Sequence, residues 1–269
     1  MKVSFGTKFG LSIIFAFLIS LTFASAQDEE PTFVVIDYMK VEPGNEEAYL
    51  VVEKVWKKIH AARVKAGQME YWELSRLLSP YGTSLEYNYK TANIYKGNKK
   101  LADHFTGSMS DLSDILTEEE IKILNTTNSV RDLVKEEVYV IDLEVFRQGA
   151  DNKIIVDNYM QLQEGASLAE HSSYEKEVWL PVHKARIDDG NMEGWANLNL
   201  VMPQGDDKEY HAVTVDFYES LDQYMMPWFD KYFAKVHPGK DLGKMSEEME
   251  KIWIRRRVDV QIRIDYVGN

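Results

Sequence analysis

The sequence has 269 residues, contains no cysteine and carries a net charge of −13. So acidic a chain repels phosphate backbones and anionic lipid, so we expect neither nucleic acid nor a membrane surface as a partner. The lack of cysteine excludes disulfides, thiolate metal sites and a lipidated cysteine.

The first 26 residues have the pattern of a secretory signal peptide. Lys2 and Lys8 form a basic start, residues 11–23 are an apolar run, and residues 24–26 (Ala-Ser-Ala) are a small-residue cleavage site. The apolar run is too short to span a bilayer as a helix. We therefore expect a bacterial protein exported to the periplasm or secreted to the medium, and loss of two lysines gives the mature chain a charge of −15.

Six elements are expected in the first half of the mature chain, residues 27–149. In chain order they are strand 33–41, helix 45–66, strands 69–78 and 85–95, a helical region 99–134 that breaks near Gly107, and strand 136–146. Pro43-Gly44 marks the turn before the first helix, and Gly67 stands where a helix C-cap is expected. The order is therefore β-α-β-β-α-β.

Residues 150–269 are expected to repeat this order. The elements are strand 153–162, helix 166–189, strands 192–201 and 208–218, helices near 220–235 and 244–252, and strand 256–267. Pro181 lies inside the first of these helices and should kink or restart it, because proline cannot donate the backbone hydrogen bond of a helix interior.

The two halves are a tandem duplication. Residues 55–72 and 178–195 are identical at nine of eighteen positions when the chain is shifted by 123, and the matched residues include Trp, His, Arg and Gly. The same shift continues downstream, whereas upstream it falls to 121, where Tyr38 matches Tyr159. The second half therefore has two additional residues, which we expect in its first helix or in the loop before that helix.

A β-α-β-β-α-β unit is the ferredoxin-like fold, an antiparallel sheet of four strands with helices on one face. Apolar side chains alternate onto both faces of the expected strand 208–218, so both faces of the sheet should be buried. We therefore predict an α+β protein in which two tandem ferredoxin-like units, residues 27–149 and 150–269, pack their antiparallel sheets as an intramolecular α/β barrel.

The helix-to-strand corner of each unit resembles a known superfamily. The pattern is a strand, Pro-Gly in the first unit, a long helix with W-x3-H-x2-R, and G-x-M-x2-W at the start of a strand. It is similar to the dimeric α/β-barrel superfamily, which includes antibiotic-biosynthesis-type monooxygenases and NIPSNAP-like proteins. The resemblance covers nearly all of the mature chain, twice, and is more specific for the fold than for an activity. It implies a ligand pocket between the helices and the sheet of each unit.

The repeated corner supplies the candidate site residues. Trp, His and Arg at i, i+4 and i+7 share one helix face, where an imidazole can accept a proton and a guanidinium can hold an oxyanion. The candidate catalytic residues are His60, His183, Arg63 and Arg186, and the candidate substrate-binding residues are Trp56, Trp72, Trp179, Trp195, Tyr38, Tyr159, Tyr87 and Tyr210. The alternative interpretation is that these side chains are repeated because they pack the core of each unit.

Three functions stay open from the sequence. The first is a small-molecule-binding protein or enzyme, such as a cofactor-independent monooxygenase that acts on an aromatic or polyketide-like substrate. The second is a haem-binding protein of the same fold with a helix histidine as axial ligand, and the third is a non-catalytic periplasmic protein. No spacing of residues supports a metal site, so no cofactor is expected outside the haem alternative. A homo-oligomer is also compatible with the sequence.

Overall fold

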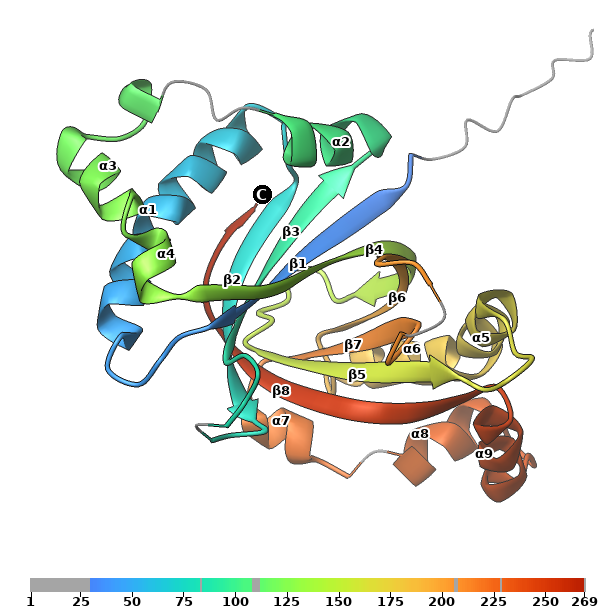
Figure 1. The fold of residues 1–269 in the computed structure, drawn as a ribbon. Helices are drawn as coiled ribbons and strands as arrows, with labels where there is room; N and C mark the ends of the chain where they lie inside the picture. The colour runs from blue at the N-terminus through green and yellow to red at the C-terminus, as the bar shows by residue number, and fades with distance from the viewer. Residues whose placement is uncertain (1–29, 83, 108–111, 206–207, 228, 269) are drawn as a thin grey trace, which may run out of the picture.

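The computed structural model describes residues 30–82, 84–107, 112–205, 208–227 and 229–268 (Figure 1). The predicted signal peptide lies outside these residues. In the described part of the chain, no helix is long and apolar enough to cross a membrane.

Eight antiparallel strands close into one barrel, and this confirms the predicted fold class. The strands are β1 (Thr32–Lys40), β2 (Tyr71–Ser79), β3 (Tyr89–Lys96), β4 (Asp132–Phe146), β5 (Ile154–Leu162), β6 (Gly194–Met202), β7 (Ala212–Tyr218) and β8 (Trp253–Gly268). Their order around the barrel is β1-β3-β2-β8-β5-β7-β6-β4. Each repeat therefore contributes a sheet of four strands in the ferredoxin-like order.

The last strand of each repeat joins the two sheets. β4 pairs with β1 of its own repeat and with β6 of the other, and β8 pairs in the same way with β5 and β2. These two strands are the longest, with 15 and 16 residues, because each serves as the edge of two sheets. Each sheet thus loses both of its free edges to the other repeat.

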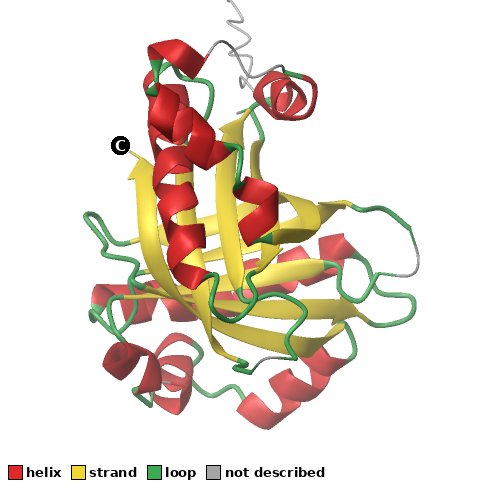
Figure 2. Cartoon of the chain, turned by 60° about the vertical axis from the view of Figure 1, so that its left-hand side comes forward, coloured by secondary structure: helices red, strands yellow, loops and turns green. Residues whose placement is uncertain are grey.

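The helices surround the outside of the barrel (Figure 2), and those of the first repeat lie together on one side of it (Figure 1). They are α1 (Glu46–Lys65), α2 (Asn98–Thr106), η1 (Leu112–Asp114), α3 (Glu118–Leu124) and α4 (Thr127–Val130). The predicted helical region 99–134 is wrong at its end, because β4 begins at Asp132. Leu133 and Asp132 pair with Met39 and Lys40 of β1, so tertiary pairing extends the strand.

The second repeat carries α5 (Leu168–Tyr174), the π-helical turn η2 (Glu175–Trp179), α6 (Leu180–Asp188), α7 (Leu221–Met225), α8 (Phe229–Val236) and α9 (Leu242–Glu250). The first three form one continuous helical path, as predicted, and the π turn directly precedes the segment that contains Pro181. A π turn adds one residue to a helix and shifts the hydrogen bonds from i−4 to i−5, which suits a site where a proline removes a donor.

The two additional residues of the second repeat can now be placed. Asn45, the N-cap of α1, directly follows Gly44, whereas Ser167, the N-cap of α5, lies two residues after Gly165. The second additional residue is in the helix. α1 has 20 residues, and the path α5–η2–α6, with 7, 5 and 9 residues, is one residue longer. One residue is therefore in the loop and the other is the π turn.

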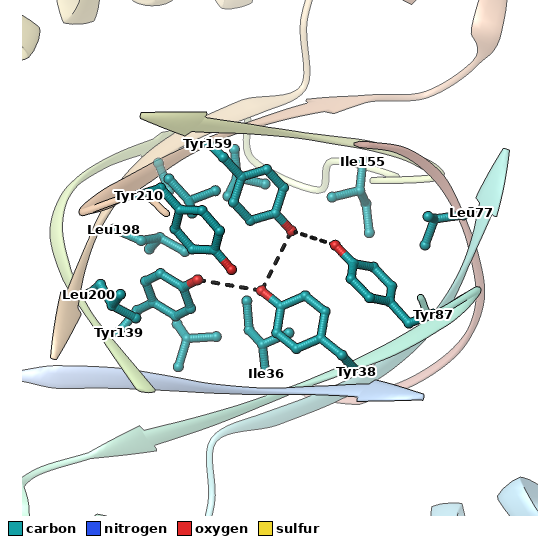
Figure 3. Close-up of a cluster of buried hydrophobic side chains, with 14 residues drawn as sticks. Ile36, Tyr38, Leu77, Tyr87, Tyr139, Ile155, Tyr159, Leu198, Leu200 and Tyr210 are labelled. Carbon is teal, nitrogen blue, oxygen red and sulfur yellow. Dashed lines mark hydrogen bonds between the residues drawn. The ribbon is translucent and has the colours of Figure 1, made fainter. Parts of the chain in front are cut away.

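The interior of the barrel is filled by side chains of both repeats. Figure 3 shows five tyrosines whose hydroxyls point toward one another, among leucine and isoleucine side chains. Beside them Lys90 donates to Asp157 at 2.8 Å and to Asp259 at 2.6 Å. This buried network is satisfied by its own members, which is the condition under which polar groups can be accommodated in a core.

Candidate functional site

A cavity of about 730 Å³ lies on the outer side of the second repeat's sheet. Residues of η2, α6 and α9 form one wall, and residues of β5, β6, β7 and the start of β8 form the other. Its lining residues are Asn158, Met160, Glu175, Trp179, His183, Trp195, Thr214, Asp216, Ser246, Met249, Glu250, Trp253, Ile254 and Arg255. We call this space the second-repeat cavity. It contains three of the predicted site residues: Trp179, His183 and Trp195.

Three indoles give the second-repeat cavity flat apolar walls. Trp195 stacks on the His183 ring with 5.0 Å between centroids and 15° between planes. Trp179 lies on the helix side, and Trp253 projects from the first residue of β8. Indole faces bind planar groups by dispersion and bind cations through their ring quadrupole.

A chain of hydrogen bonds lies behind the His183 imidazole. Arg186 donates to His183 Nδ1 at 3.3 Å and to the Tyr218 hydroxyl at 3.0 Å, and Tyr218 donates to Asp216 at 3.3 Å. Arg186 is fully buried, and the Asp216 carboxyl lies close enough to favour its charge. Burial lowers the pKa of His183 well below its usual range, and the nearby Arg186 charge lowers it further.

The bond from Arg186 fixes the tautomer of His183. A guanidinium can only donate, so Nδ1 of His183 must accept, and the proton of the neutral ring is on Nε2. In this arrangement the cavity-lining imidazole offers an N–H donor, suited to a carbonyl or oxyanion of a ligand. The role of His183 as a base stays a prediction. The only lone pair of the neutral ring is on Nδ1 and accepts from Arg186, so this role requires Arg186 to release Nδ1.

Glu175 is a second polar group of the cavity wall, and it was not among the predicted site residues. The residue is 2% exposed, and within the described chain it lies beside His171, whose Nε2 is 3.6 Å from Glu175 Oε1. Burial lowers the pKa of His171 to about 4, so this partner is neutral at pH 7. Burial, followed by the nearby Asp216 carboxyl, raises the pKa of Glu175 well above its usual range.

The corresponding corner of the first repeat has the same stack but different surroundings. His60 lies between Trp56 and Trp72, with ring centroids 5.8 and 5.1 Å away. The Trp56 indole donates to Thr127 of α4 at 3.2 Å, so α4 holds it in place. Burial, with a smaller effect of the Arg63 charge, lowers the pKa of His60 to about 3. The predicted group Trp56, His60 and Trp72 is therefore brought together as a packed, neutral stack.

Arg131 makes the first repeat differ from the second. Arg131 Nε lies 3.7 Å from Glu53 Oε1, and both side chains are largely buried. Glu53 corresponds to Glu175, because one inserted loop residue makes the number difference between equivalent positions 122 at the start of the helix. Each glutamate lies four residues after a buried ring side chain, Tyr49 in the first repeat and His171 in the second. Among the described residues, the buried Glu53 carboxyl thus has a guanidinium beside it, whereas the buried Glu175 carboxyl has no cation beside it.

Strand pairing identifies what replaces Arg131. β4 places Leu133 opposite Met39, and β8 places Arg255 opposite Met160, the repeat equivalent of Met39. Arg131 lies two residues before Leu133, and Trp253 lies two residues before Arg255, so Arg131 and Trp253 occupy equivalent positions. The guanidinium that neutralises the first-repeat carboxylate is therefore replaced by an indole that lines the second-repeat cavity.

The other predicted residues lie elsewhere. Arg63 lines a separate cavity of about 670 Å³ near the end of α1, together with Tyr95 and His104. The four predicted tyrosines are inside the barrel, on the opposite face of the sheet from the tryptophans: Tyr38, Tyr87, Tyr159 and Tyr210. Tyr87 and Tyr210 precede β3 and β7, which begin later than the predicted strands 85–95 and 208–218.

Two signals in the sequence could have found the missed residues. The π turn breaks the repeat register, so a fixed shift of 123 places Lys176 rather than Glu175 opposite Glu53. Allowing one insertion within the helix would have aligned the two glutamates. Trp253 lies just before the expected strand 256–267, and the first repeat has no tryptophan at the matching position. A difference of this kind between the repeats marks a position worth examining. In the described residues, no group of His, Asp and Glu has the arrangement of a metal site.

Comparison with solved structures supports the fold. A proposed monooxygenase from Lactobacillus acidophilus superposes with a TM-score of 0.54 and 12% identity, covering 89% of this chain and 97% of that one. A proposed monooxygenase from Fusobacterium nucleatum gives 0.56 and 9%, with 90% and 96% covered. A haem-binding protein from Thermus thermophilus gives 0.48 and 10%, with 88% and 92% covered.

The first two likenesses, together with the closed barrel, show that the chain has the dimeric α/β-barrel fold, formed here by one chain, as the sequence resemblance implied. No family model matches the sequence, and no curated protein matches it either. At identities near 10% the comparisons describe the fold and not the activity of this chain.

Proposed function

We propose that this protein is an exported small-molecule-binding protein and that its ligand is a planar aromatic compound held in the second-repeat cavity. The observation that carries this proposal is the cavity of about 730 Å³ walled by Trp179, Trp195 and Trp253. Its size is that of a site for a drug-sized molecule, and a few polar groups on apolar walls are typical of such sites. His183 Nε2–H would donate to an oxygen of the ligand.

The reaction that we propose for this site is cofactor-independent oxygenation. In such a reaction an activated CH2 group of the aromatic ligand and O2 give a carbonyl group and water, which balances atoms and electrons. The two structural neighbours named as proposed monooxygenases support this choice. The Nε2–H of His183 would stabilise the phenolate or enolate that precedes electron transfer to O2.

Native mass spectrometry of residues 27–269, purified without added ligand and then incubated with a set of aromatic compounds, tests the binding proposal. We expect a bound mass that is lost in Trp179→Ala. The matched control is Trp56→Ala in the first repeat, which should keep the ligand. A protein that binds none of the compounds, or that loses them equally in both variants, would refute the proposal.

Haem binding is the second candidate, and the geometry at His183 does not fit it directly. A histidine that binds iron through Nε2 carries its proton on Nδ1, usually donated to a carbonyl or carboxylate. Here Nδ1 accepts from Arg186, so Arg186 would have to move. Titration with haemin distinguishes the two candidates, because a Soret band that is lost in His183→Ala would support haem.

Export is part of the same proposal. It rests on the basic start, the apolar run and the Ala-Ser-Ala site at residues 24–26. Fractionation of expressing cells and sequencing of the mature N-terminus test it. A periplasmic or secreted product that begins at Gln27 is expected, and a cytoplasmic product that still begins at Met1 would contradict it.

A further inference from the structure

We propose that the ligand of the second-repeat cavity is an aromatic amine whose ammonium group pairs with Glu175. This inference rests on the proposed function and adds the ligand's charge to it. It follows from the difference between the repeats: Glu53 has Arg131 as its counter-ion, whereas Glu175 has Trp253 at the equivalent place and opens to a cavity.

The carboxyl groups around the cavity outnumber its guanidinium groups, which favours a cationic ligand. Glu175, Asp216 and Glu250 line it together with a single guanidinium, that of Arg255. Arg255 donates to Asn158 at 3.4 Å, and Arg186, behind His183, is bonded to Tyr218 and His183. The nearby cations thus have their own partners, and His171 beside Glu175 is neutral at pH 7.

The aromatic walls suit the same ligand. Trp253 lies at the position of the missing guanidinium, and His171 packs edge-on against it at 4.6 Å between centroids. An ammonium group next to Glu175 would contact indole faces, a combination that binds organic cations in other proteins. The ion pair and the cation–π contact would act on one group.

The spacing along the helix gives the ligand's approximate length. Glu175 and His183 are eight residues apart on the continuous path η2–α6, which corresponds to about 12 Å at 1.5 Å per residue. Trp179 lies midway between them. A ligand with an amine at one end, a planar ring system beside Trp179 and an oxygen at the other end near His183 would span this distance.

A matched set of three probes tests the charge preference by isothermal titration calorimetry at pH 7. The probes are 2-(1-naphthyl)ethylamine, 2-(1-naphthyl)ethanol and 1-naphthylacetate, which are cationic, neutral and anionic. We expect the amine to bind at least about tenfold more tightly than the alcohol, and the acid to bind most weakly. Equal affinities for amine and alcohol would overturn the proposal.

Variants then assign the preference to one carboxyl group. Glu175→Gln should remove the preference for the amine and leave the alcohol's affinity unchanged. Glu177→Gln, an exposed neighbour in the same π turn, should change neither. Persistence of the preference in Glu175→Gln would refute the role of Glu175. Urea unfolding of both variants checks that the fold is intact.

A measurement on the wild-type protein covers the case in which Glu175→Gln does not fold. Burial favours the protonated form of Glu175, so pairing with an ammonium ion should release a proton. His171 on α5 lies beside it and Asp216 on β7 is close enough to act on it, and the other charged or titratable groups of the cavity wall are His183 on α6, Glu250 on α9 and Arg255 on β8. The amine's binding enthalpy should therefore depend on the buffer's ionisation enthalpy, whereas the alcohol's should not.

The outcomes separate this inference from the proposed function. If the alcohol binds and needs Trp179, while the amine has no advantage and releases no proton, the aromatic site stands and the amine proposal is wrong. If none of the three probes binds the wild-type protein, both are wrong.

Discussion

Replacing Glu53 by Gln should make the protein's stability markedly less dependent on pH. The Glu53 side chain is 4% exposed, and burial raises its pKa from 4.5 to about 7, while Arg131 and the Tyr49 hydroxyl oppose this effect. The folded protein therefore holds a proton that the unfolded chain releases above about pH 4.5. The wild-type protein must lose stability as the pH rises from about 4.5 to 7, and the variant lacks this contribution.

The magnitude follows from the two pKa values. The difference between 4.5 and about 7 corresponds to about 3 kcal/mol at full ionisation, of which about 2.5 kcal/mol lies between pH 5 and pH 8. Glu73 and Asp37 are also buried, with pKa values raised by burial to about 7 and about 6. They act in the same direction in both proteins, so their effect cancels in the comparison.

The assay is urea unfolding followed by tryptophan fluorescence at pH 5 and pH 8. Loss of the partner of Arg131 lowers the stability of Glu53→Gln at both pH values, so the informative quantity is the change in unfolding free energy between them. This change should be smaller in the variant by about 2–3 kcal/mol. Glu47→Gln, an exposed position on the same helix, should match the wild type. An identical pH dependence in Glu53→Gln and wild type would refute the reasoning.

Two further predictions concern the barrel. Lys90→Met should lower the unfolding free energy by about 3–5 kcal/mol in urea titration, because it leaves the buried Asp157 carboxylate without a cation, while Asp259 keeps only Arg257; a variant as stable as wild type would show that the network tolerates the loss of its central cation. Gly194→Ala should cost about 1–3 kcal/mol, because a Cβ there would lie 2.2 Å from Phe146 Cδ1. Thermal unfolding of Gly194→Ala combined with Phe146→Ala checks the cause, since only a steric clash is relieved by removing the ring.

The repeat was the most informative feature of the sequence. Periodicity and turn residues placed all eight strands within a few residues, and the Trp, His and Arg positions indicated the corner of each unit where the rings stack. Helix and strand periods are local properties, so a single sequence can show them. The site roles of these residues stay predictions that the proposed variants address.

Other features could not be predicted, because they depend on partners distant in the sequence. The first residues of β4 are strand only through pairing with β1, and the tyrosine hydroxyls meet only once two sheets enclose them. Tyr87 and Tyr210 lie before the first residues of β3 and β7, and both nevertheless belong to the cluster inside the barrel.

The sequence by itself determined the α+β class, the two ferredoxin-like units and their closure into one barrel, since hydrophobic periodicity and duplication are written along the chain. Only the tertiary structure decided that the two units differ at equivalent corners. Arg131 neutralises Glu53 in the first, whereas Trp253 and a π turn leave Glu175 facing a cavity in the second. The physical reason is that the charge state of a buried carboxyl depends on what the neighbouring strand places against it, and that neighbour lies almost 80 residues away in both repeats.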